Sequence, residues 1–264
     1  MRVIELDEST VPALDAYLRK DLSANLYVIY DLQYERKSRA TFHIAEEHGS
    51  IRGVLLKYRG YPHPLAVVLG SDDAVHLLLD NVDVERMVLL ATPELTKVLG
   101  EKFPNASKSE VNIMLLNGPA ANLIVRHNVS RLGADDTCVF ARSLADRVGE
   151  NLAEDDLAEA RRLLAANAAF GIFDGDLLVS SAISHVRLPE GWAIGGIFTD
   201  PRYRGRGLAM SVTSALTQEA LRYTNRVVLF VRADNAPAIH IYRKIGFRNI
   251  ARRTWLDTGN GISP

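Results

Sequence analysis

A turn rich in arginine and glycine is the segment of the sequence best suited to binding an anion. Its cationic and small residues are Arg202, Arg204, Gly205, Arg206 and Gly207. An apolar run precedes the turn, and a helical pattern follows it from Leu208 and Ala209, so the unpaired amides of a first helical turn lie at the loop. Glycines leave such amides accessible, and arginines add donors suited to phosphate oxygens. The turn therefore predicts a pyrophosphate site; a glycine turn with solvated arginines is the alternative.

A second group of residues follows the next apolar run, 226–231. Asn235 and Pro237 are typical of the start of a helix, and Gly246 is typical of its end. Tyr242 lies on the apolar face of this predicted helix. The sequence thus places a strand before each of two helices, with polar residues at both strand-to-helix junctions.

Together the two segments resemble the acyl-CoA signature of the Gcn5-related N-acetyltransferase (GNAT) superfamily. The segment that resembles the first family motif reads Arg204-x-x-Gly207-x-Ala209. The segment that resembles the second, at the expected separation, reads Asn235-x-x-Ala238-x-x-x-Tyr242-x-x-x-Gly246-Phe247. The resemblance covers roughly residues 140–256, and the first half of the chain lacks both motifs.

The resemblance implies acetyl-CoA, or another acyl-CoA, as co-substrate, without a metal. Backbone groups at Ile197, Phe198 and Thr199 would pair with the pantetheine arm. The pyrophosphate would be wrapped by the loop of Arg204, Gly205, Arg206, Gly207, Leu208 and Ala209. Asn235 would hydrogen-bond the cofactor arm, and Tyr242 would protonate the leaving thiolate as general acid. A helix cap at Asn235 and a core aromatic at Tyr242 are the alternatives.

The general base is not assigned by the sequence. Phe230 occupies the position at which the ribosomal-protein acetyltransferases of the family carry Glu, which argues against that subclass. The apolar run 192–197 contains no carboxylate either. His185, expected at the end of a strand Leu177–Ser184, is the candidate base, and a solvated histidine at a strand end is the alternative.

Two stretches of the chain have the same order of predicted elements. Residues 42–57 and 170–185 each predict a strand, a glycine turn and a longer strand, with His48-Gly49 and Asp174-Gly175 at the turns. Helical patterns precede both, and a further strand follows both. The predicted helices are 11–20 and 152–166, and the predicted strands 65–69 and 192–199.

This echo predicts an α/β (α+β) protein of two tandem GNAT-like folds, each a mixed, mostly antiparallel sheet flanked by helices. We place a degenerate N-terminal domain at 1–130 and a catalytic acyl-CoA-binding domain at 131–264, whose sheet a last strand, Phe247–Leu256, would complete. Ser71-Asp72-Asp73 aligns with the phosphate turn, and its carboxylates would repel phosphate. The first copy would then be structural or would shape the acceptor pocket. Glycine N-acyltransferases are similar in this layout.

Composition restricts the partners. The chain has 264 residues, 47% of them hydrophobic, and a net charge of -1. Nothing in this balance favours nucleic acid or an anionic membrane. No apolar run spans a bilayer and no signal peptide is evident, so a cytoplasmic protein is expected. The single cysteine, Cys138, is expected in a buried strand of the apolar run 137–140.

The leading hypothesis is an acyl-CoA-dependent N-acyltransferase that acts on the amine of a small molecule or amino acid. A protein or peptide N-acetyltransferase is an alternative within the same chemistry. A non-catalytic acyl-CoA-binding regulatory module is the rival from another class, and the missing Glu favours it. A nucleotide-binding protein is disfavoured because no Lys-Ser/Thr pair follows the glycines. A homodimer is left open.

Overall fold

The computed structural model describes residues 1–59, 64–84, 86–118, 121–148 and 152–259. Its contacts divide the chain into two compact units. The first unit comprises Met1–Ile113, Val231–Asn235 and Ile250–Pro264, and the second comprises Met114–Phe230 and Ala236–Asn249. Each unit therefore takes segments from both halves of the sequence. The predicted domains at 1–130 and 131–264 do not coincide with these contact units, and that division of the sequence stays a prediction.

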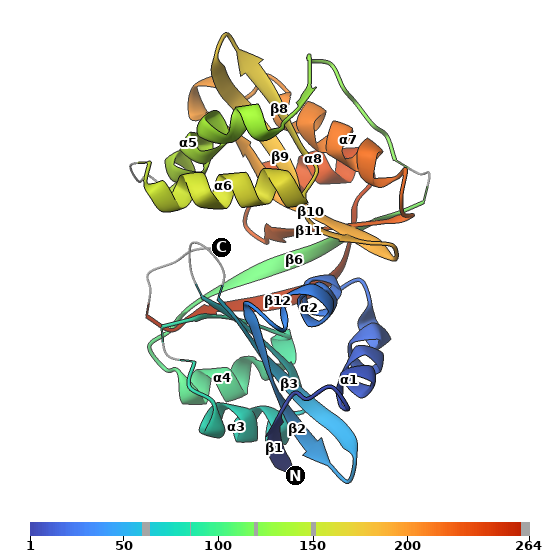
Figure 1. The fold of residues 1–264 in the computed structure, drawn as a ribbon, viewed down its shortest axis with the longest axis vertical. Coiled ribbons are helices and arrows are strands. Elements are labelled where there is room, and N and C mark those ends of the chain that lie inside the picture. Colours follow the sequence, from blue (N-terminus) through green and yellow to red (C-terminus); the bar gives the residue numbers. More distant parts are fainter. Residues whose placement is uncertain (60–63, 85, 119–120, 149–151, 260–264) are drawn as a thin grey trace. The chain divides into compact units, whose positions relative to one another are not determined.

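The same order of strands and helices occurs twice along the chain, which confirms the tandem repeat (Figure 1). The first series is β1 (Arg2–Glu5), α1 (Val11–Leu18), α2 (Leu26–Tyr30), β2 (Ala40–Glu47), β3 (Ser50–Tyr58), β4 (Leu65–Gly70), α3 (Asp72–Asn81), β5 (Val88–Ala91), α4 (Thr96–Lys102) and β6 (Ser107–Asn117). The second series is β7 (Ser130–Arg131), α5 (Thr137–Val148), α6 (Glu154–Ala166), β8 (Ala169–Asp174), β9 (Leu177–Leu188), β10 (Gly191–Thr199), α7 (Leu208–Ala220), β11 (Arg226–Arg232), α8 (Ala236–Ile245) and β12 (Arg248–Asp257).

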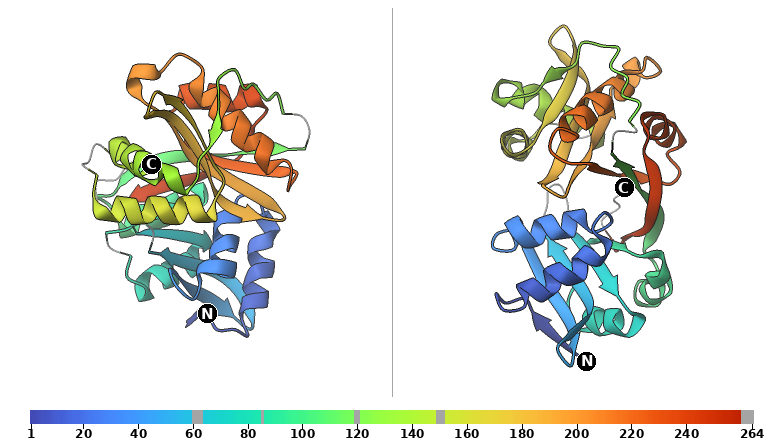
Figure 2. Two further views of the ribbon diagram at one scale, coloured as in Figure 1. Left: turned by 45° about the horizontal axis from the view of Figure 1, so that its top comes forward. Right: turned by 90° about the vertical axis from the view of Figure 1, so that its right-hand side faces the viewer.

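Each unit is built on a mixed, mostly antiparallel sheet, as expected. The strand order is β1-β2-β3-β4-β5-β12 in the first unit and β11-β10-β9-β8-β7 in the second, while β6 contributes Ser107–Ile113 to the first unit and Met114–Asn117 to the second. The parallel pairs are β4–β5 and β10–β11. Helices cover both faces of each sheet: α1 and α2 lie opposite α3 and α4, and α5 and α6 lie opposite α7 and α8 (Figures 1 and 2). The fold class is confirmed.

The two predicted glycine turns are both present. His48 and Gly49 have positive φ angles of 50° and 78°, and they join β2 to β3 as a two-residue hairpin. Gly175, with a φ of 58°, joins β8 to β9. Positive φ explains why glycine occupies the second position of each pair.

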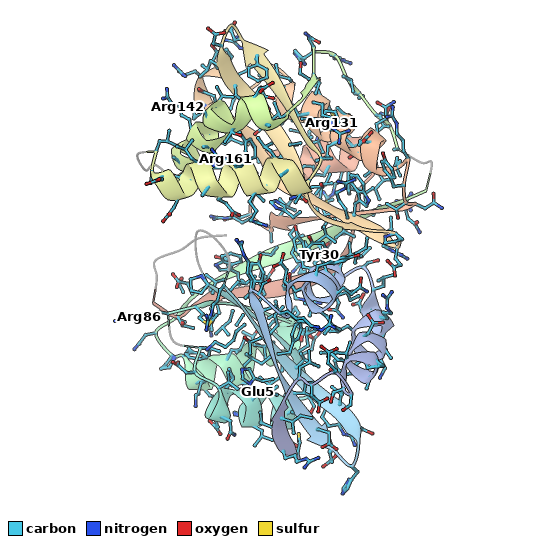
Figure 3. The ribbon with its side chains drawn as sticks, viewed as in Figure 1. Glu5, Tyr30, Arg86, Arg131, Arg142 and Arg161 are labelled. Atoms are coloured by element: carbon cyan, nitrogen blue, oxygen red, sulfur yellow. The ribbon has the colours of Figure 1, made fainter. Side chains whose placement is uncertain are left out.

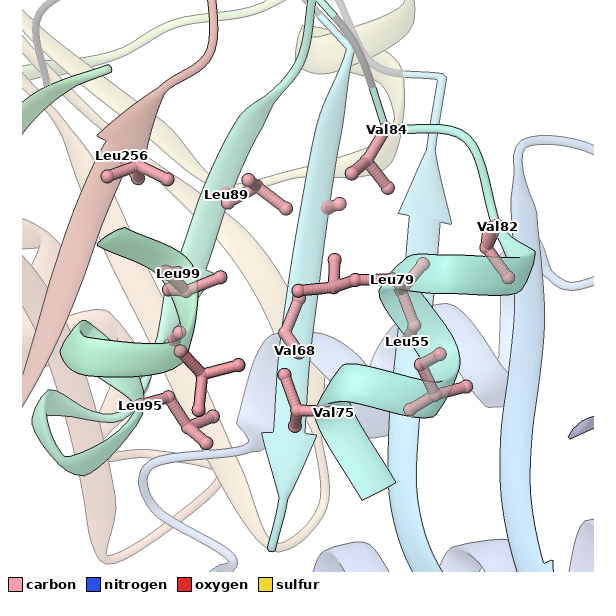
Figure 4. Close-up of a cluster of buried hydrophobic side chains, with 14 of the residues drawn as sticks. Leu55, Val68, Val75, Leu79, Val82, Val84, Leu89, Leu95, Leu99 and Leu256 are labelled. Atoms are coloured by element: carbon pink, nitrogen blue, oxygen red, sulfur yellow. The ribbon is translucent and has the colours of Figure 1, made fainter. Parts of the chain in front are cut away.

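The core of the first unit lies between its sheet and the helices α3 and α4 (Figure 4). Leu55, Val68 and Leu89 from the strands and Leu78 and Leu99 from the helices are fully buried there. The core also includes Leu256 of β12, from near the C-terminus. Aliphatic side chains at alternate strand positions and at helical spacing thus converge on one layer.

The pairing of the last strand corrects the sequence expectation. The strand predicted at Phe247–Leu256 is present as β12, but it pairs antiparallel with β5 of the first unit, with Thr254 opposite Ala91. A buried Arg253 adds a hydrogen bond of 3.2 Å to Asn25 Oδ1 in that unit. The alternation of side chains identifies a strand but carries no information about which edge it joins.

Cys138 is not a strand residue. It is exposed and lies in the first turn of α5. The preceding Gly133–Asp136 turn starts the helix, because the Asp136 carboxylate accepts the Gly133 amide at 2.8 Å. Phe140 and Ala141 then face the core at helical spacing, so the short apolar run belongs to a helix. The helix and strand patterns of so short a run cannot be distinguished by period.

Asp31 begins a π-helical turn, Asp31–Glu35, that continues directly from α2. Burial, with a smaller contribution from the charge of Glu35, raises the pKa of the Asp31 carboxyl to about 8. In the unfolded chain an aspartate ionises near pH ~4. Between these two pKa values the folded state holds a proton that the unfolded state has lost, so rising pH destabilises the fold.

We therefore expect the free energy of unfolding to fall by up to about 1.4 kcal/mol per pH unit through this window because of Asp31. Urea denaturation of the parent and of Asp31→Asn at several pH values measures the effect as the difference between the two curves. The difference in unfolding free energy between the two proteins should not vary with pH below the pKa of Asp31 in the unfolded chain. It should change through the window and become constant again above the pKa of Asp31 in the folded protein. Parallel curves throughout the window would show that Asp31 ionises normally.

Candidate functional site

The predicted anion-binding turn connects β10 to α7. Gly205 and Gly207 have φ angles of 78° and 81°, in the left-handed region that favours glycine. Gly207 is the N-cap of α7, and the first hydrogen bond inside the helix runs from the Ser211 amide to the Gly207 carbonyl at 3.2 Å. The amides of residues 208–210 therefore have no acceptor within the helix. They are free to bind an anion.

The space in front of these amides is open. A Cβ placed on Gly205 meets no described atom within 4 Å, and one placed on Gly207 meets Cε1 of His127 at 3.8 Å. Both glycines are exposed, as are Arg204 and Arg206. The backbone can thus approach a diphosphate at positions where any side chain would intrude, so the loop fits an acyl-CoA pyrophosphate.

The three arginines of the turn differ in their surroundings. Arg202 is paired with the Asp200 carboxylate, Nη2 to Oδ2 at 2.6 Å, and this pairing lowers the pKa of Asp200. The guanidinium of Arg206 lies over the ring of Tyr203, 5.0 Å from its centroid. Arg204 stays exposed. Because Asp200 offsets one charge, Arg204 and Arg206 supply most of the positive potential of the loop.

β10 separates from its parallel neighbour β11 partway along its length. The ladder joins Trp192–Ile194 to Val227–Leu229 and ends there. The predicted pantetheine-binding residues, 197–199, lie beyond the end of this ladder. An extended ligand arm laid along them would continue the sheet in the place where β11 no longer pairs.

A β-bulge accompanies this separation. The register between β10 and β9 shifts between Gly195 and Phe198, and Gly196 has a φ of 53°. Ser180 fixes the end of β10, because its hydroxyl donates to the Phe198 carbonyl at 2.7 Å and lies 2.9 Å from Thr199 Oγ1. The bulge and this contact hold the end of β10 on β9, away from β11.

Asn235 and Tyr242 lie at the start and in the body of α8. Asn235 directly precedes the helix, and its backbone N–H donates to the Arg232 carbonyl at 3.1 Å. The Tyr242 ring is 6% exposed and packs edge-on against Phe247 at 6.2 Å. Burial raises the pKa of Tyr242 to about 12. Its hydroxyl has no hydrogen-bond partner within the described residues, so it is a protonated donor available to a ligand.

The position of His185 in its strand differs from the expectation. The strand does not end at Ser184 but runs over Leu177–Leu188, with Val186 and Leu188 buried beyond the histidine. The polar Ser184-His185 pair resembles a strand end in sequence, but Ser184 is buried within a continuous buried stretch, 178–184, and the strand continues past it. His185 is therefore an interior strand residue.

His185 also lies at a second irregularity of the β9–β10 ladder. Ala193 pairs with Val186, whereas the next residue, Ile194, pairs with Ser184. His185 is thus the extra residue of a β-bulge, a feature that redirects a side chain, and it is half-buried. Its role as general base stays a prediction.

Comparisons with known proteins agree with this geometry. The family model described as FR47-like protein matches residues 169–256. A tandem GNAT protein from the clavulanic acid biosynthesis pathway superposes with a TM-score of 0.63 at 16% identity, covering 100% of this chain and 99% of that one. The chain has a tandem GNAT fold.

Two curated relatives of this chain are acetyltransferases. Streptothricin acetyltransferase of Streptomyces lavendulae is 34% identical over 100 residues, which are 38% of this chain and 50% of that protein. Mycothiol acetyltransferase of Saccharomonospora viridis is 44% identical over 52 residues, which are 19% of this chain and 17% of that protein. The chain thus spans half or less of the length of these relatives.

The first copy of the GNAT fold has no counterpart of the phosphate loop. Ser71 alone separates β4 from α3, whereas residues 200–207 separate β10 from α7. Asp72 and Asp73 occupy the first turn of α3. A Cβ placed on Gly70 would lie 2.5 Å from backbone, so the chain is closed up at this turn. Both the space and the charge oppose a phosphate there.

The GNAT motifs do not include one residue that the structure places at the loop. His127 lies in the segment between the two copies, which carries no recognisable pattern, and its Cε1 is 3.8 Å from the position of a Cβ built on Gly207. Across the described residues, no helix is both long and apolar enough to cross a membrane. The same residues contain no group of three or more His, Cys, Asp or Glu arranged to hold a metal ion.

Proposed function

We propose that this chain transfers an acyl group from acetyl-CoA, or a related acyl-CoA, to the amine of a small molecule or amino acid in the cytoplasm. The loop of residues 204–209 carries the proposal, because it combines unpaired helix amides, two glycines with positive φ and exposed arginines. The relatives support the chemistry, since both are named as acetyltransferases and neither is named for a protein substrate.

The proposed reaction is a direct attack of the amine on the thioester. The amine nitrogen forms a bond to the acyl carbon, the carbon–sulfur bond breaks, and the thiolate leaves with the electron pair. The thiolate takes a proton from the Tyr242 hydroxyl, and the amine releases one of its own protons to a base or to water. An oxyanion forms in between, and a backbone amide of β10 beyond Ile194 would stabilise it. The extended arm of the donor would lie along residues 197–199, with Asn235 as a further partner.

The rival function is an acyl-CoA-binding regulatory module without catalysis. Phe230 favours it, because a phenylalanine in β11 cannot accept a proton. Tyr242 favours the enzyme, because binding alone does not require a proton donor at this position. The two functions differ in one observable, the release of free thiol.

A thiol-release assay with acetyl-CoA and pools of amines tests the proposal directly. Thiol release that depends on one pool, with acetylated amine detected by mass, supports an N-acyltransferase. A protein that binds acetyl-CoA but releases no thiol with small amines, amino acids or peptides would instead be the regulatory module.

We expect one acyl-CoA to bind per chain. The phosphate loop occurs once, and the corresponding turn of the first copy is closed by Gly70 and carries Asp72 and Asp73. Calorimetric titration with CoA should therefore give a stoichiometry near one. Two sites of similar affinity per chain would show that the first copy retains a cofactor site.

A further inference from the structure

The segment between the two copies is attached to the helix that forms the phosphate loop. The Ile124 amide donates to Ser214 Oγ at 3.1 Å, and the Arg126 amide donates to Ser211 Oγ at 3.1 Å. Both serines are on α7 and at most 1% exposed. Buried serines in a helix interior are unusual unless their hydroxyls are used, and here they bind the backbone of residues 122–127.

A second attachment follows directly after this segment, in β7. Arg131, labelled in Figure 3, places Nη1 3.1 Å from Oε1 of Glu219, a residue near the end of α7 that is 6% exposed. The segment is therefore fixed to α7 at both ends. Residues near its first attachment have defined positions relative to the phosphate loop.

His127 is the residue of this segment that reaches the loop. Its Nδ1 lies 2.8 Å from Ser211 Oγ, and its Cε1 faces Gly207. The Ser211 hydroxyl already accepts the Arg126 amide and has one proton to donate. His127 Nδ1 is within reach of that proton, and the direction of the bond depends on the histidine tautomer. In the tautomer in which Nδ1 accepts from Ser211, the ring proton is on Nε2.

We propose that His127 donates a hydrogen bond from Nε2 to a pyrophosphate oxygen of the bound acyl-CoA. The inference rests on the function proposed above. Cε1, which lies between the two ring nitrogens, is 3.8 Å from the position of a Cβ built on Gly207, so this edge of the ring lies beside the loop, and Ser211 occupies Nδ1 but not Nε2. The same phosphate would accept the amides of residues 208–210. His127 completes the site from outside both family motifs, and the linker between the copies becomes part of the cofactor site.

Two amide substitutions separate binding by Nε2 from a structural role of Nδ1. Glutamine at position 127 places its amide nitrogen near the position of Nε2, whereas asparagine places it near Nδ1. We expect His127→Asn to weaken CoA binding about tenfold or more, the usual loss for a hydrogen bond to a charged group. His127→Gln should stay within about threefold of the parent. His127→Phe, which has no donor, should match the asparagine variant.

Calorimetry with CoA and with dephospho-CoA measures these losses without reference to the acceptor. Dephospho-CoA retains the pyrophosphate but lacks the 3′-phosphate, so the same fold-loss is expected with both ligands. His76→Asn, at an exposed histidine of α3, is the control and should bind both ligands like the parent.

Three results would overturn the inference. A His127→Asn variant that binds CoA with the affinity of the parent would show that binding does not require the donor at Nε2. Weakening by glutamine but not by asparagine would show that His127 acts through Ser211 on structure alone. A loss present with CoA but absent with dephospho-CoA would assign the contact to the 3′-phosphate. A parent that does not bind CoA would remove the proposed function itself, whereas a parent that binds normally confines any failure to His127.

Discussion

Replacing Tyr242 with phenylalanine should lower the rate of acyl transfer about 100-fold or more while acyl-CoA affinity changes little. The ring would keep its place, because it is 6% exposed and packs edge-on against Phe247. Only the hydroxyl is lost, and it has no partner among the described residues that the change would leave unpaired. Since burial raises the pKa of Tyr242 to about 12, the parent carries the proton across the useful pH range.

Single-turnover kinetics under conditions in which the chemical step limits the rate measure the effect. Tyr223→Phe is the matched control, because Tyr223 is 58% exposed and stacks on Trp192 in the same unit. That variant should react like the parent. Equal rates for Tyr242→Phe and the parent would remove Tyr242 from the mechanism and leave the thiolate to be protonated by water.

Replacing Gly207 with leucine should weaken CoA binding by a comparable factor, about 100-fold or more. The new side chain would enter the open space before the helix amides, and the loss of two hydrogen bonds to a charged group costs about 3–6 kcal/mol. A φ of 81° also strains any L side chain by about 1–2 kcal/mol, so a small loss of stability is expected.

Gly49→Leu separates strain from occlusion. Gly49 has a φ of 78° and no described atom within 4 Å of its Cβ position, but it lies in the hairpin between β2 and β3. The Gly49→Leu protein should be destabilised by about as much as the Gly207→Leu protein, but it should bind CoA with the affinity of the parent. Unchanged affinity in a folded Gly207→Leu protein would contradict the assignment of the loop as the pyrophosphate site.

Local signals in the sequence predicted most of the fold. The hairpins follow from His48-Gly49 and Gly175, where positive φ has to be adopted, and the phosphate loop follows from glycines next to a helical pattern. The run around Cys138 was predicted wrongly because four residues cannot separate a period of 2 from one of 3.6. The partner of β12 could not be predicted at all, since strand pairing depends on tertiary packing.

Candidate site residues could be proposed from the sequence only where they lie in motifs. The turn at 204–209 and the helix that carries Tyr242 were found because spacing and residue type agree there. His127 was not proposed from the sequence, because its place beside the loop depends on hydrogen bonds between Ser211, Ser214 and a linker with no periodicity. The bulge that places His185 inside a strand is likewise a property of strand register, which a single strand does not encode.

The pairing of β12 with β5 determines when the first unit can finish folding during synthesis. The Met87 amide donates to Thr258 Oγ1 across a separation of 171 residues, and Leu256 belongs to the core of that unit. While the ribosome is still making the second copy, β5 has an unpaired edge, which other nascent chains can bind. Completion of the first unit therefore waits for residues 254–258 to leave the exit tunnel.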